Sequence, residues 1–403
     1  MPLNYKPLTF TTTLRNPERA KYFLKVIEKF EEKKLTNELA IEIVVNCIKE
    51  KIYRADKSYN EIPRLKKKYT SNEKLSLDEA WELQQASDQD HKEKGFDWGW
   101  SSRFYTLYGL LRKLGFVYFS PPNLSVKKIE LSELGRHLIG CAKLENKPAP
   151  WKDEIGISDL EKSVFAHALT KYQRKNPFTA ELNQNFPLSL LIRTIKLLNE
   201  ERVNNKQDPV GISKKEIPLI GVWKNNNANE LFNKIQEIRS TYGSDPSDEI
   251  ILEKCDEISG GRYNSWQDTS ILKEMPDEFI RKMKITGLFT IRGLGRYLDI
   301  NKNRREVCDY VIDKYSNVGD FVYENLESEK KYFDYASKID NTFINYETKP
   351  IERASSGQLD NWLGVYDWQK IKKELLVLKE RNGRSQDPVL KLIDRPERLE
   401  FLS

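Results

Sequence analysis

A pattern that occurs twice constrains the fold of this chain more than any other feature: a helix, a short apolar hairpin and a second helix. In the first copy, residues 103–114 have helical periodicity, Gly115 ends the helix, and FVYFS and VKKIEL are predicted strands. In the second copy, PDEFIRKMKIT is the predicted helix, and LFTIRG and RYLDIN flank a Gly-Leu-Gly turn. Helix, hairpin and helix form the second half of a winged helix, so the sequence predicts two winged-helix units.

Helical patterns dominate the rest of the chain. The predicted helix starts carry capping residues, namely Asn16, Thr36, Ser76, Ser132 and Ser213. We therefore expect a mainly α protein with small β-hairpins (α+β), in which two winged-helix units are followed by a helical linker. The expected domains are residues 1–150, 151–320 and 321–403.

Positive charge is concentrated in the two repeated segments. The net charge of the whole chain is only +6. Residues 101–139 hold six Lys or Arg against two acidic residues, and residues 277–305 hold eight against three. Concentrated positive charge on helix–hairpin units favours a polyanionic partner, here duplex DNA. The lysine-rich segment 64–74 (RLKKKYTSNEK) is interpreted as a solvated linker, with DNA contact as the weaker alternative.

Candidate DNA-contacting residues lie in both units. In the first unit they are at the start of the helix, where a recognition helix reaches base edges, and in the hairpin: Ser102, Arg103, Tyr105, Thr106, Lys127 and Lys128. In the second unit they are cations of the helix and the hairpin: Arg281, Lys282, Lys284, Arg292 and Arg296. Phosphate contacts from the cations would supply most of the affinity. Tyr105 fits the helix core equally well, and Arg292 and Arg296 also fit a solvated hairpin tip.

Composition disfavours several classes of protein. No stretch approaches the ~18 uninterrupted apolar residues of a membrane span, and the N-terminus lacks the apolar core of a signal peptide. A soluble, cytoplasmic protein without membrane contact is therefore expected. The four cysteines are dispersed and the three histidines are isolated, which disfavours structural zinc, disulfides and a histidine-based nucleophile triad.

Two enzymatic alternatives have local motifs. Gly293-Leu-Gly295 begins like a dinucleotide-binding GxGxxG, but the third glycine is missing and a strand follows instead of a helix, so a hairpin turn is favoured. Glu347-Thr-Lys349, with Asp334 or Asp340 upstream, matches a nuclease-type D…ExK in which acids hold Mg²⁺. Apolar strands do not surround this motif, which favours a linker with chance charges. A complete Mg²⁺-dependent nuclease stays an alternative, as does a winged-helix regulator that contacts proteins.

Four blocks of sequence together resemble a known family. They are TFTTTLRNPERAKYFLKVIEKFE near the N-terminus, SSRFYTLYGLLRKLGFVYF with IELSELGRHLI, ITGLFTIRG with YLDIN, and DRPERLEFL at the C-terminus. Over essentially its whole length the chain resembles the AlwI family of type IIS restriction endonucleases, which includes nicking enzymes of the BstNBI kind. TTTLRNPER is the most specific block. The resemblance makes Arg15, Asn16 and Arg19 candidates for DNA contact, beside their simpler interpretation as the cap and first turn of a helix.

The resemblance also implies a division of labour. Members of that family combine an N-terminal recognition region of winged-helix units, a helical linker and a C-terminal PD-(D/E)xK nuclease domain that needs Mg²⁺. They bind a short asymmetric site in double-stranded DNA and cut at a fixed distance to one side. A segment like RPERLEFL opens the nuclease domain in the family. We therefore expect this chain to be the recognition part, without catalytic residues, metal or cofactor of its own. The nuclease domain would be deleted or a separate subunit, and the chain would bind DNA as a monomer without cutting it.

Overall fold

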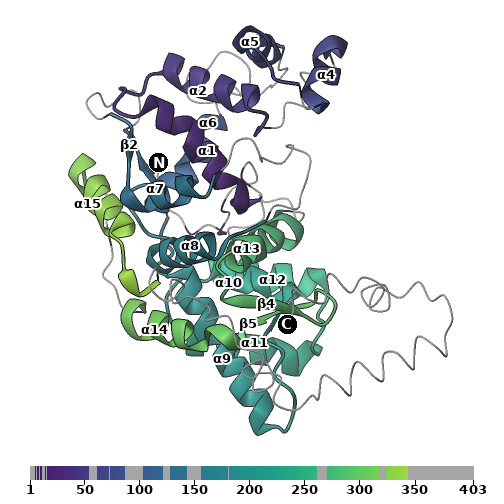
Figure 1. Ribbon diagram of the computed structural model, residues 1–403. Helices are drawn as coiled ribbons and strands as arrows, with labels where there is room; N and C mark the ends of the chain where they lie inside the picture. The colour runs from purple at the N-terminus through teal and green to yellow at the C-terminus, as the bar shows by residue number, and fades with distance from the viewer. Residues whose placement is uncertain are drawn as a thin grey trace, which may run out of the picture. The chain divides into compact units, whose positions relative to one another are not determined.

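The computed structural model describes residues 5, 7–8, 10, 14, 16–53, 61–71, 73–86, 103–120, 128–142, 156–179, 181–260, 270–316, 321 and 324–343. The chain divides into a compact unit, Met1–Ile344, and a second unit, Asn345–Ser403. All described residues belong to the first unit, which is mainly helical (Figure 1). The described residues also form two small antiparallel sheets. The expectation of a mainly helical chain with small hairpins is therefore confirmed.

The elements before residue 150 follow one another in the order helix, helix, two short helices, helix, hairpin and helix. They are α1 (Ala20–Ile27), α2 (Asn37–Lys49), α4 (Pro63–Thr70), α5 (Leu77–Gln85), α6 (Arg103–Lys113), β1 (Val117–Tyr118), β2 (Glu130–Leu131) and α7 (Glu133–Gly140). Helix α2 packs against α5 and α6, and α1 packs against α7.

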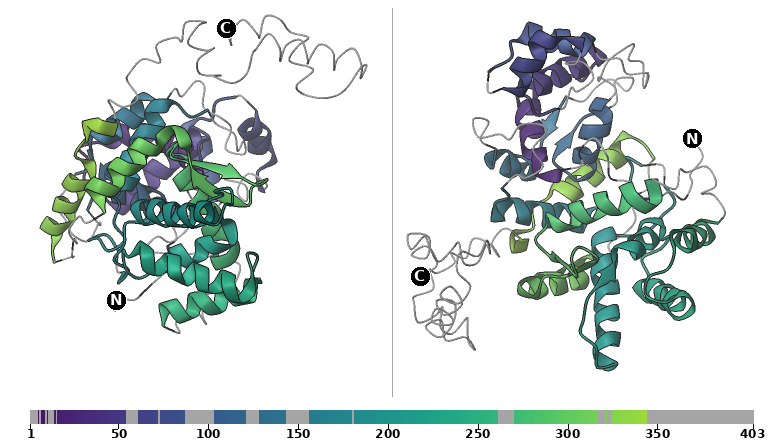
Figure 2. Two further views of the ribbon diagram at one scale, coloured as in Figure 1. Left: turned by 90° about the horizontal axis from the view of Figure 1, so that it is seen from below. Right: turned by 90° about the vertical axis from the view of Figure 1, so that its right-hand side faces the viewer.

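The elements after residue 150 begin with a buried helix, α8 (Asp159–Lys171), and then repeat a similar order. They are α9 (Pro187–Asn204), β3 (Ile212–Ser213), α10 (Ile217–Val222), α11 (Ala228–Tyr242), α12 (Asp248–Ser259), α13 (Met275–Lys284), β4 (Phe289–Arg292), β5 (Tyr297–Ile300), α14 (Arg305–Tyr315) and α15 (Leu326–Ser337). The left panel of Figure 2 shows the β4–β5 hairpin as green arrows.

The strand order is the same in both halves. In the second half the order is β3-β5-β4, with β5 in the middle and every pair antiparallel. In the first half β1 pairs with β2, and Lys34, between α1 and α2, forms an antiparallel bridge with Lys128 on the approach to β2. In each half, the segment that follows α1 or α9 therefore lies beside the last strand, β2 or β5. The repeat is longer than the sequence pattern predicted, because it includes this first short strand.

Local capping explains most of the helix starts. The side chains of Thr36, Ser76, Ser132 and Ser213 each accept a hydrogen bond from a backbone N–H of the following turn, as predicted. These oxygens satisfy donors that have no partner inside the helix. Asn16 precedes the 3₁₀ helix Pro17–Arg19, but its side chain makes no capping hydrogen bond. Its side-chain oxygen instead accepts a hydrogen bond from Arg281.

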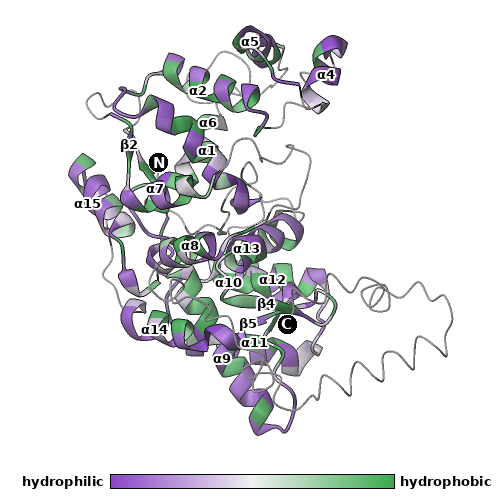
Figure 3. Ribbon diagram, viewed as in Figure 1, coloured by the Kyte–Doolittle hydropathy of each residue, from purple (hydrophilic) through white to green (hydrophobic). Residues whose placement is uncertain are grey.

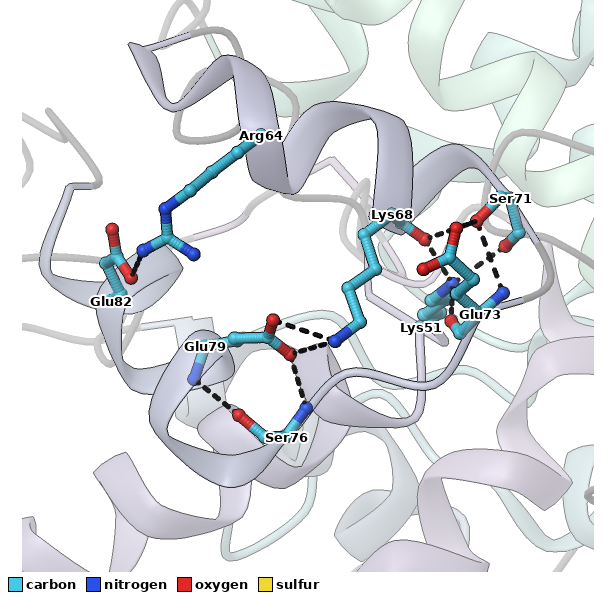
Figure 4. Close-up of polar contacts among 8 residues, drawn as sticks. All are labelled: Lys51, Arg64, Lys68, Ser71, Glu73, Ser76, Glu79 and Glu82. Atoms are coloured by element: carbon cyan, nitrogen blue, oxygen red, sulfur yellow. Dashed lines mark hydrogen bonds and ion pairs between the residues drawn. The ribbon is translucent and has the colours of Figure 1, made fainter.

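The lysine-rich segment 64–74 is helical over most of its length, so its interpretation as a linker was wrong. Residues 64–70 belong to α4, which lies beside α5 (Figure 4). Lys68 bonds both carboxylate oxygens of Glu79, and Arg64 pairs with Glu82. Leu65 and Tyr69 are buried beneath them. The two buried side chains and the less exposed pair Lys68–Glu79 therefore do most to stabilise a short helix that its own sequence would not.

Contacts join the two halves inside the first unit. Lys21 of α1 forms a buried ion pair with Glu161 of α8, at 2.7 Å, and the backbone N–H of Leu8 bonds the carbonyl of Gly221. The predicted domain boundaries at residues 150 and 320 stay predictions. Helix α15 is largely hydrophilic in Figure 3, and Tyr332 and Phe333 are among its buried residues. Among the described residues, no helix has the length and apolar character to cross a membrane.

Candidate nucleic-acid interface

The second hairpin ends in a tight turn with an unusual residue at its tip. Arg292 of β4 pairs with Tyr297 of β5, and the Arg296 N–H bonds the Gly293 carbonyl at 3.2 Å. Gly293, Leu294 and Gly295 all have positive φ, at 58°, 56° and 93°. Glycine adopts this backbone region freely, whereas it costs a leucine roughly 1–2 kcal/mol. Leu294 is also fully exposed, at 104% of its reference area.

Exposed cations surround the base of this turn. Arg296 is exposed, and its carbonyl accepts a hydrogen bond from the Lys214 backbone N–H at 2.8 Å. Lys214 is exposed as well, and the neighbouring Lys215 pairs with Asp245 at 2.8 Å. Within the described part of the chain, no carboxylate lies within ion-pair distance of Arg296 or Lys214. The charge of Arg296 nevertheless helps to lower the pKa of Asp245, after the larger effect of Lys215. Two exposed cations without a close ion pair therefore lie next to the hairpin turn, as a phosphate-binding surface requires.

Arg292 organises the base of the hairpin. Its Nε atom pairs with Asp299 at 3.0 Å and its Nη1 atom donates to the Pro209 carbonyl at 3.1 Å. Asp299 also accepts from the Asn199 side chain, which fixes β5 against α9. These groups line a cavity of about 660 Å³ between α9, β5 and α14. The guanidinium of Arg292 is thus committed to neighbours, with one third of its side chain exposed.

Helix α13 lies against the N-terminal segment. The Arg281 Nη1 atom donates to the Asn16 Oδ1 atom at 3.0 Å, and its Nε atom pairs with Asp277 at 3.1 Å. Lys282 is 2% exposed and its Nζ atom donates to the Leu14 carbonyl at 2.6 Å. Burial lowers the pKa of Lys282 to about 8, against the attraction of nearby Glu278. The ammonium group therefore supports the N-terminal segment from inside the protein.

The family-specific block TTTLRNPER is described only in part, because Arg15 lies outside the described residues. Asn16 and Arg19 are buried, at 8% and 7% exposure. Burial raises the pKa of Glu18, and a backbone hydrogen bond and the charges of Arg19 and Arg281 oppose this shift. Asn16, Arg281 and Lys282 are brought together in this cluster. Their common role in the structure is to join the N-terminal segment to α13.

In the first half, one side of helix α6 is open around Gly109, as far as the described residues show. Thr106 is half-buried, and a Cβ atom added at Gly109 would meet no described atom within 4 Å. The Tyr105 ring packs on Phe104 and Phe119, with centroids 5.2 and 6.4 Å apart, and burial raises its pKa to about 12. Tyr105 therefore belongs mostly to the aromatic core. The helical spacing of Thr106 and Gly109 puts them on the same side of α6.

The remaining candidates of the first half are described unevenly. Ser102 and Lys127 lie outside the described residues, and of Arg103 only the backbone, at the first position of α6, is described. Lys128 is 62% exposed and forms a 3.1 Å ion pair with Glu32 across its bridge to Lys34. An exposed pair of this kind contributes little to stability, so Lys128 is available for exchange with another anion.

The acids of the alternative nuclease motif have other partners where they are described. Asp340 accepts hydrogen bonds from Tyr310 and Tyr315 and pairs with Lys314. Burial alone would raise the pKa of Asp340, but these hydrogen bonds hold it below its ordinary value. Asp334 pairs with Lys330, whereas Glu347 and Lys349 lie outside the described residues. No group of three or more His, Cys, Asp or Glu side chains that could hold a metal occurs among the described residues.

Sequence reasoning missed two features of the second hairpin. It treated Leu294 only as the middle of a Gly-Leu-Gly turn, although a leucine between two turn glycines is itself a signal. It also gave no sign that Lys214, which begins the 3₁₀ helix Lys214–Glu216 after its predicted cap Ser213, lies beside the hairpin, because pairing of β3 with β5 joins residues far apart in the chain. Lys284 at the end of α13 is exposed, as its candidate role requires.

Comparisons with known proteins give one structural and one family result. A solved structure titled "Crystal structure of pyrene- and phenanthrene-modified DNA in complex with the BpuJ1 endonuclease binding domain" is similar at 13% sequence identity and a TM-score of 0.41, over 84% of this chain and 96% of that one. The search of curated proteins finds no match. The model of the family described as "AlwI restriction endonuclease" matches residues 112–363, which is more than half of the sequence. The chain therefore belongs to the AlwI restriction endonuclease family.

Proposed function

We propose that this chain is the sequence-specific DNA-recognition module of a type IIS restriction or strand-nicking endonuclease. It binds a short asymmetric site in double-stranded DNA through two winged-helix units, residues 1–150 and 151–320. Residues 321–403 form the linker to a PD-(D/E)xK nuclease domain, which uses Mg²⁺ and cuts at a fixed distance. No ligand of that metal is assigned to the described residues.

The repeated strand order is the observation that supports this proposal most. In a winged helix, a short strand after the first helix pairs with the last strand, and the last strand pairs with the strand that precedes it in the hairpin. The pairs Lys34–Lys128 with β1–β2, and β3–β5 with β4–β5, have this arrangement. In each case the helix before the hairpin, α6 or α13, is then the recognition helix.

The distribution of side chains fits two different kinds of contact. Exposed cations at the second hairpin, Arg296 and Lys214, suit phosphate groups, which supply affinity for any sequence. The open side of α6 around Thr106 and Gly109 suits a groove, where Arg103 at the helix start would bond a guanine. Lys282 and Arg19, being buried, are left out of the proposed contact surface.

An experiment with two variants tests whether base contacts and phosphate contacts come from different side chains. The preferred site is first selected from a library of random duplexes with the wild-type chain. Arg103→Ala should then cost about 1–3 kcal/mol at the selected site and relax base preference at one position. Lys284→Ala, at an exposed cation of α13, should weaken binding to selected and random duplexes by the same factor. If Arg103→Ala leaves both affinity and preference unchanged, α6 is not a recognition helix.

A further inference from the structure

We propose that Leu294 is an apolar wedge that enters the minor groove of the bound duplex and partly separates two stacked base pairs. The proposal rests on the proposed function, because it requires the second hairpin to contact duplex DNA. It adds a specific deformation of the DNA to the recognition of its sequence. A leucine side chain between base pairs widens the step on the minor-groove side and bends the duplex toward the major groove.

The exposure of Leu294 distinguishes it from other apolar surface residues. Single apolar side chains on a protein surface are ordinary and by themselves indicate nothing. Among the described residues, Leu77, Tyr242 and Val203 are the other large apolar side chains above 40% exposure, at 41%, 42% and 58%, so each is partly covered by the protein. Leu294 is 104% exposed and no part of its side chain is covered. The part of the chain that the structure describes gives this leucine no packing contact.

Besides its exposure, the backbone conformation at position 294 is unfavourable for leucine. Its φ of 56° lies in the left-handed region, where glycine and asparagine are the residues that a tight hairpin turn usually has. Leucine has no side-chain hydrogen bond to offer this conformation. A residue that is both strained and uncovered indicates a contact outside the free protein, because strained residues concentrate where a ligand is bound.

The shape of the tip suits a narrow groove. Gly293 and Gly295 have no side chains, so Leu294 projects alone from the turn. A Cβ atom added at Gly295 would meet nothing within 4 Å among the described atoms, so space is not what requires this glycine. Its φ of 93° requires glycine, and the lack of a side chain keeps the tip of the hairpin narrow. The minor groove of B-form DNA is only about 6 Å wide, and a wider tip could not enter it.

The charges beside the tip select DNA over an apolar pocket on another protein. Arg296 directly follows the turn, and the Lys214 backbone is bonded to it. Both cations are exposed, and among the described residues neither forms an ion pair within 4.0 Å, although the charge of Arg296 acts on Asp245. Two phosphate-bearing strands line the minor groove, and its negative potential attracts arginine. Cations beside an exposed apolar tip therefore suit a groove in which phosphate groups lie beside stacked bases.

Fluorescence of 2-aminopurine tests the wedge directly, because this base brightens when it is unstacked. Duplexes that carry the selected site are prepared with 2-aminopurine at successive positions. The wild-type chain should raise the fluorescence at one base step, and Leu294→Met should keep this rise. Leu294→Asn suits the same backbone conformation but removes the apolar group. It should abolish the rise and weaken binding about tenfold, the free energy of a partly buried leucine.

Two controls separate the wedge from trivial effects. Leu77→Ala changes another exposed leucine, on α5, and should alter neither fluorescence nor affinity. Thermal unfolding of Leu294→Asn should occur no lower than that of the wild type, which excludes a folding defect.

The possible outcomes keep the two proposals apart. If the wild type prefers its selected site but brightens no step, or if Leu294→Asn brightens it equally, the wedge is wrong and site recognition stands. If the wild type selects no site and binds all duplexes alike, the proposed function is wrong, and the wedge falls with it. Capture of an apolar protein surface by the wild type, lost in Leu294→Asn without any change in DNA binding, also overturns the wedge.

Discussion

The Nη1 atom of Arg281 donates a hydrogen bond to the Oδ1 atom of Asn16 at 3.0 Å, and so joins α13 to a segment 265 residues earlier in the chain. The next residue of α13, Lys282, bonds the Leu14 carbonyl from a buried position. The N-terminal segment therefore supports the helix that we propose as the second recognition helix. Changes in this segment should affect DNA binding through the position of α13.

Removal of the Asn16 amide should destabilise the protein. Asn16→Ala leaves the partly buried Arg281 guanidinium without this acceptor, and we expect the free energy of unfolding to fall by about 1 kcal/mol. Asn16→Ala and Arg281→Ala should be non-additive in urea denaturation, because both remove one bond. Asn303→Ala, at an exposed asparagine, is the matched control and should have almost no effect. Unchanged stability with weaker DNA binding would instead place Asn16 in direct contact with DNA.

Lys282 should make stability depend on pH in alkaline solution. Its pKa is lowered from 10.5 to about 8 in the folded protein, so the folded state releases a proton that the unfolded chain still holds between these values. The free energy of unfolding of the wild type should therefore rise, relative to Lys282→Met, from about pH 8 to about pH 10.5, by at most roughly 3 kcal/mol. Urea denaturation of both proteins across this range measures the difference. A constant difference would mean that Lys282 is not buried as an ammonium group.

Arg296 should contribute to DNA binding through a phosphate contact. Arg296→Ala should weaken binding to all duplexes and lower the slope of log K against log salt by about 0.9. Lys331→Ala is the control, because Lys331 is an exposed cation on α15, which lies well apart from β4 and β5 in Figure 1. Fluorescence anisotropy over a series of salt concentrations gives both slopes. An equal effect of the two substitutions would mean that net charge, and not the hairpin, accounts for the contribution of Arg296.

Gly109 offers a test in which stability and binding change in opposite directions. Alanine in place of a glycine within a helix stabilises it by about 0.5–1 kcal/mol, and at Gly109 the added methyl group meets no described atom. Gly109→Ala should therefore raise the free energy of unfolding. If DNA lies against this side of α6, the same methyl group should weaken binding to the selected site. Higher stability with unchanged affinity would place the DNA elsewhere.

Local features of the fold could be predicted from the sequence because they depend on neighbouring residues. Thr36, Ser76 and Ser132 cap helices through bonds to backbone groups at most three residues away. The strands β4 and β5 are joined by a turn whose glycines identify it. Elements that depend on distant partners were harder to predict. The pairing of Ile212 with Leu298 and the helical state of residues 64–70 depend on β5 and α5, and neither has a local signal.

At the candidate site too, the sequence predicts what depends on neighbouring residues but not what depends on distant contacts. Lys282 and Lys284 are equally basic in the sequence, yet one is buried and the other exposed. Their difference arises because the N-terminal segment covers one side of α13, which no pattern within residues 275–284 indicates. Asn16 has the residue type and position of a helix cap, but its amide bonds Arg281 instead. Charge counts thus located the basic regions, whereas tertiary contacts decided which cations face outward.

The ratio of specific to non-specific affinity tests the central proposal most directly. The wild-type chain is titrated by fluorescence anisotropy, at physiological ionic strength, with its selected duplex and with a scrambled duplex of the same composition. A recognition module should bind the selected duplex at least about a thousandfold more tightly. It should leave both duplexes uncut when Mg²⁺ is present. Equal affinity for the two duplexes would contradict sequence-specific recognition, and cleavage that Glu347→Ala abolishes would show that this chain is itself the nuclease.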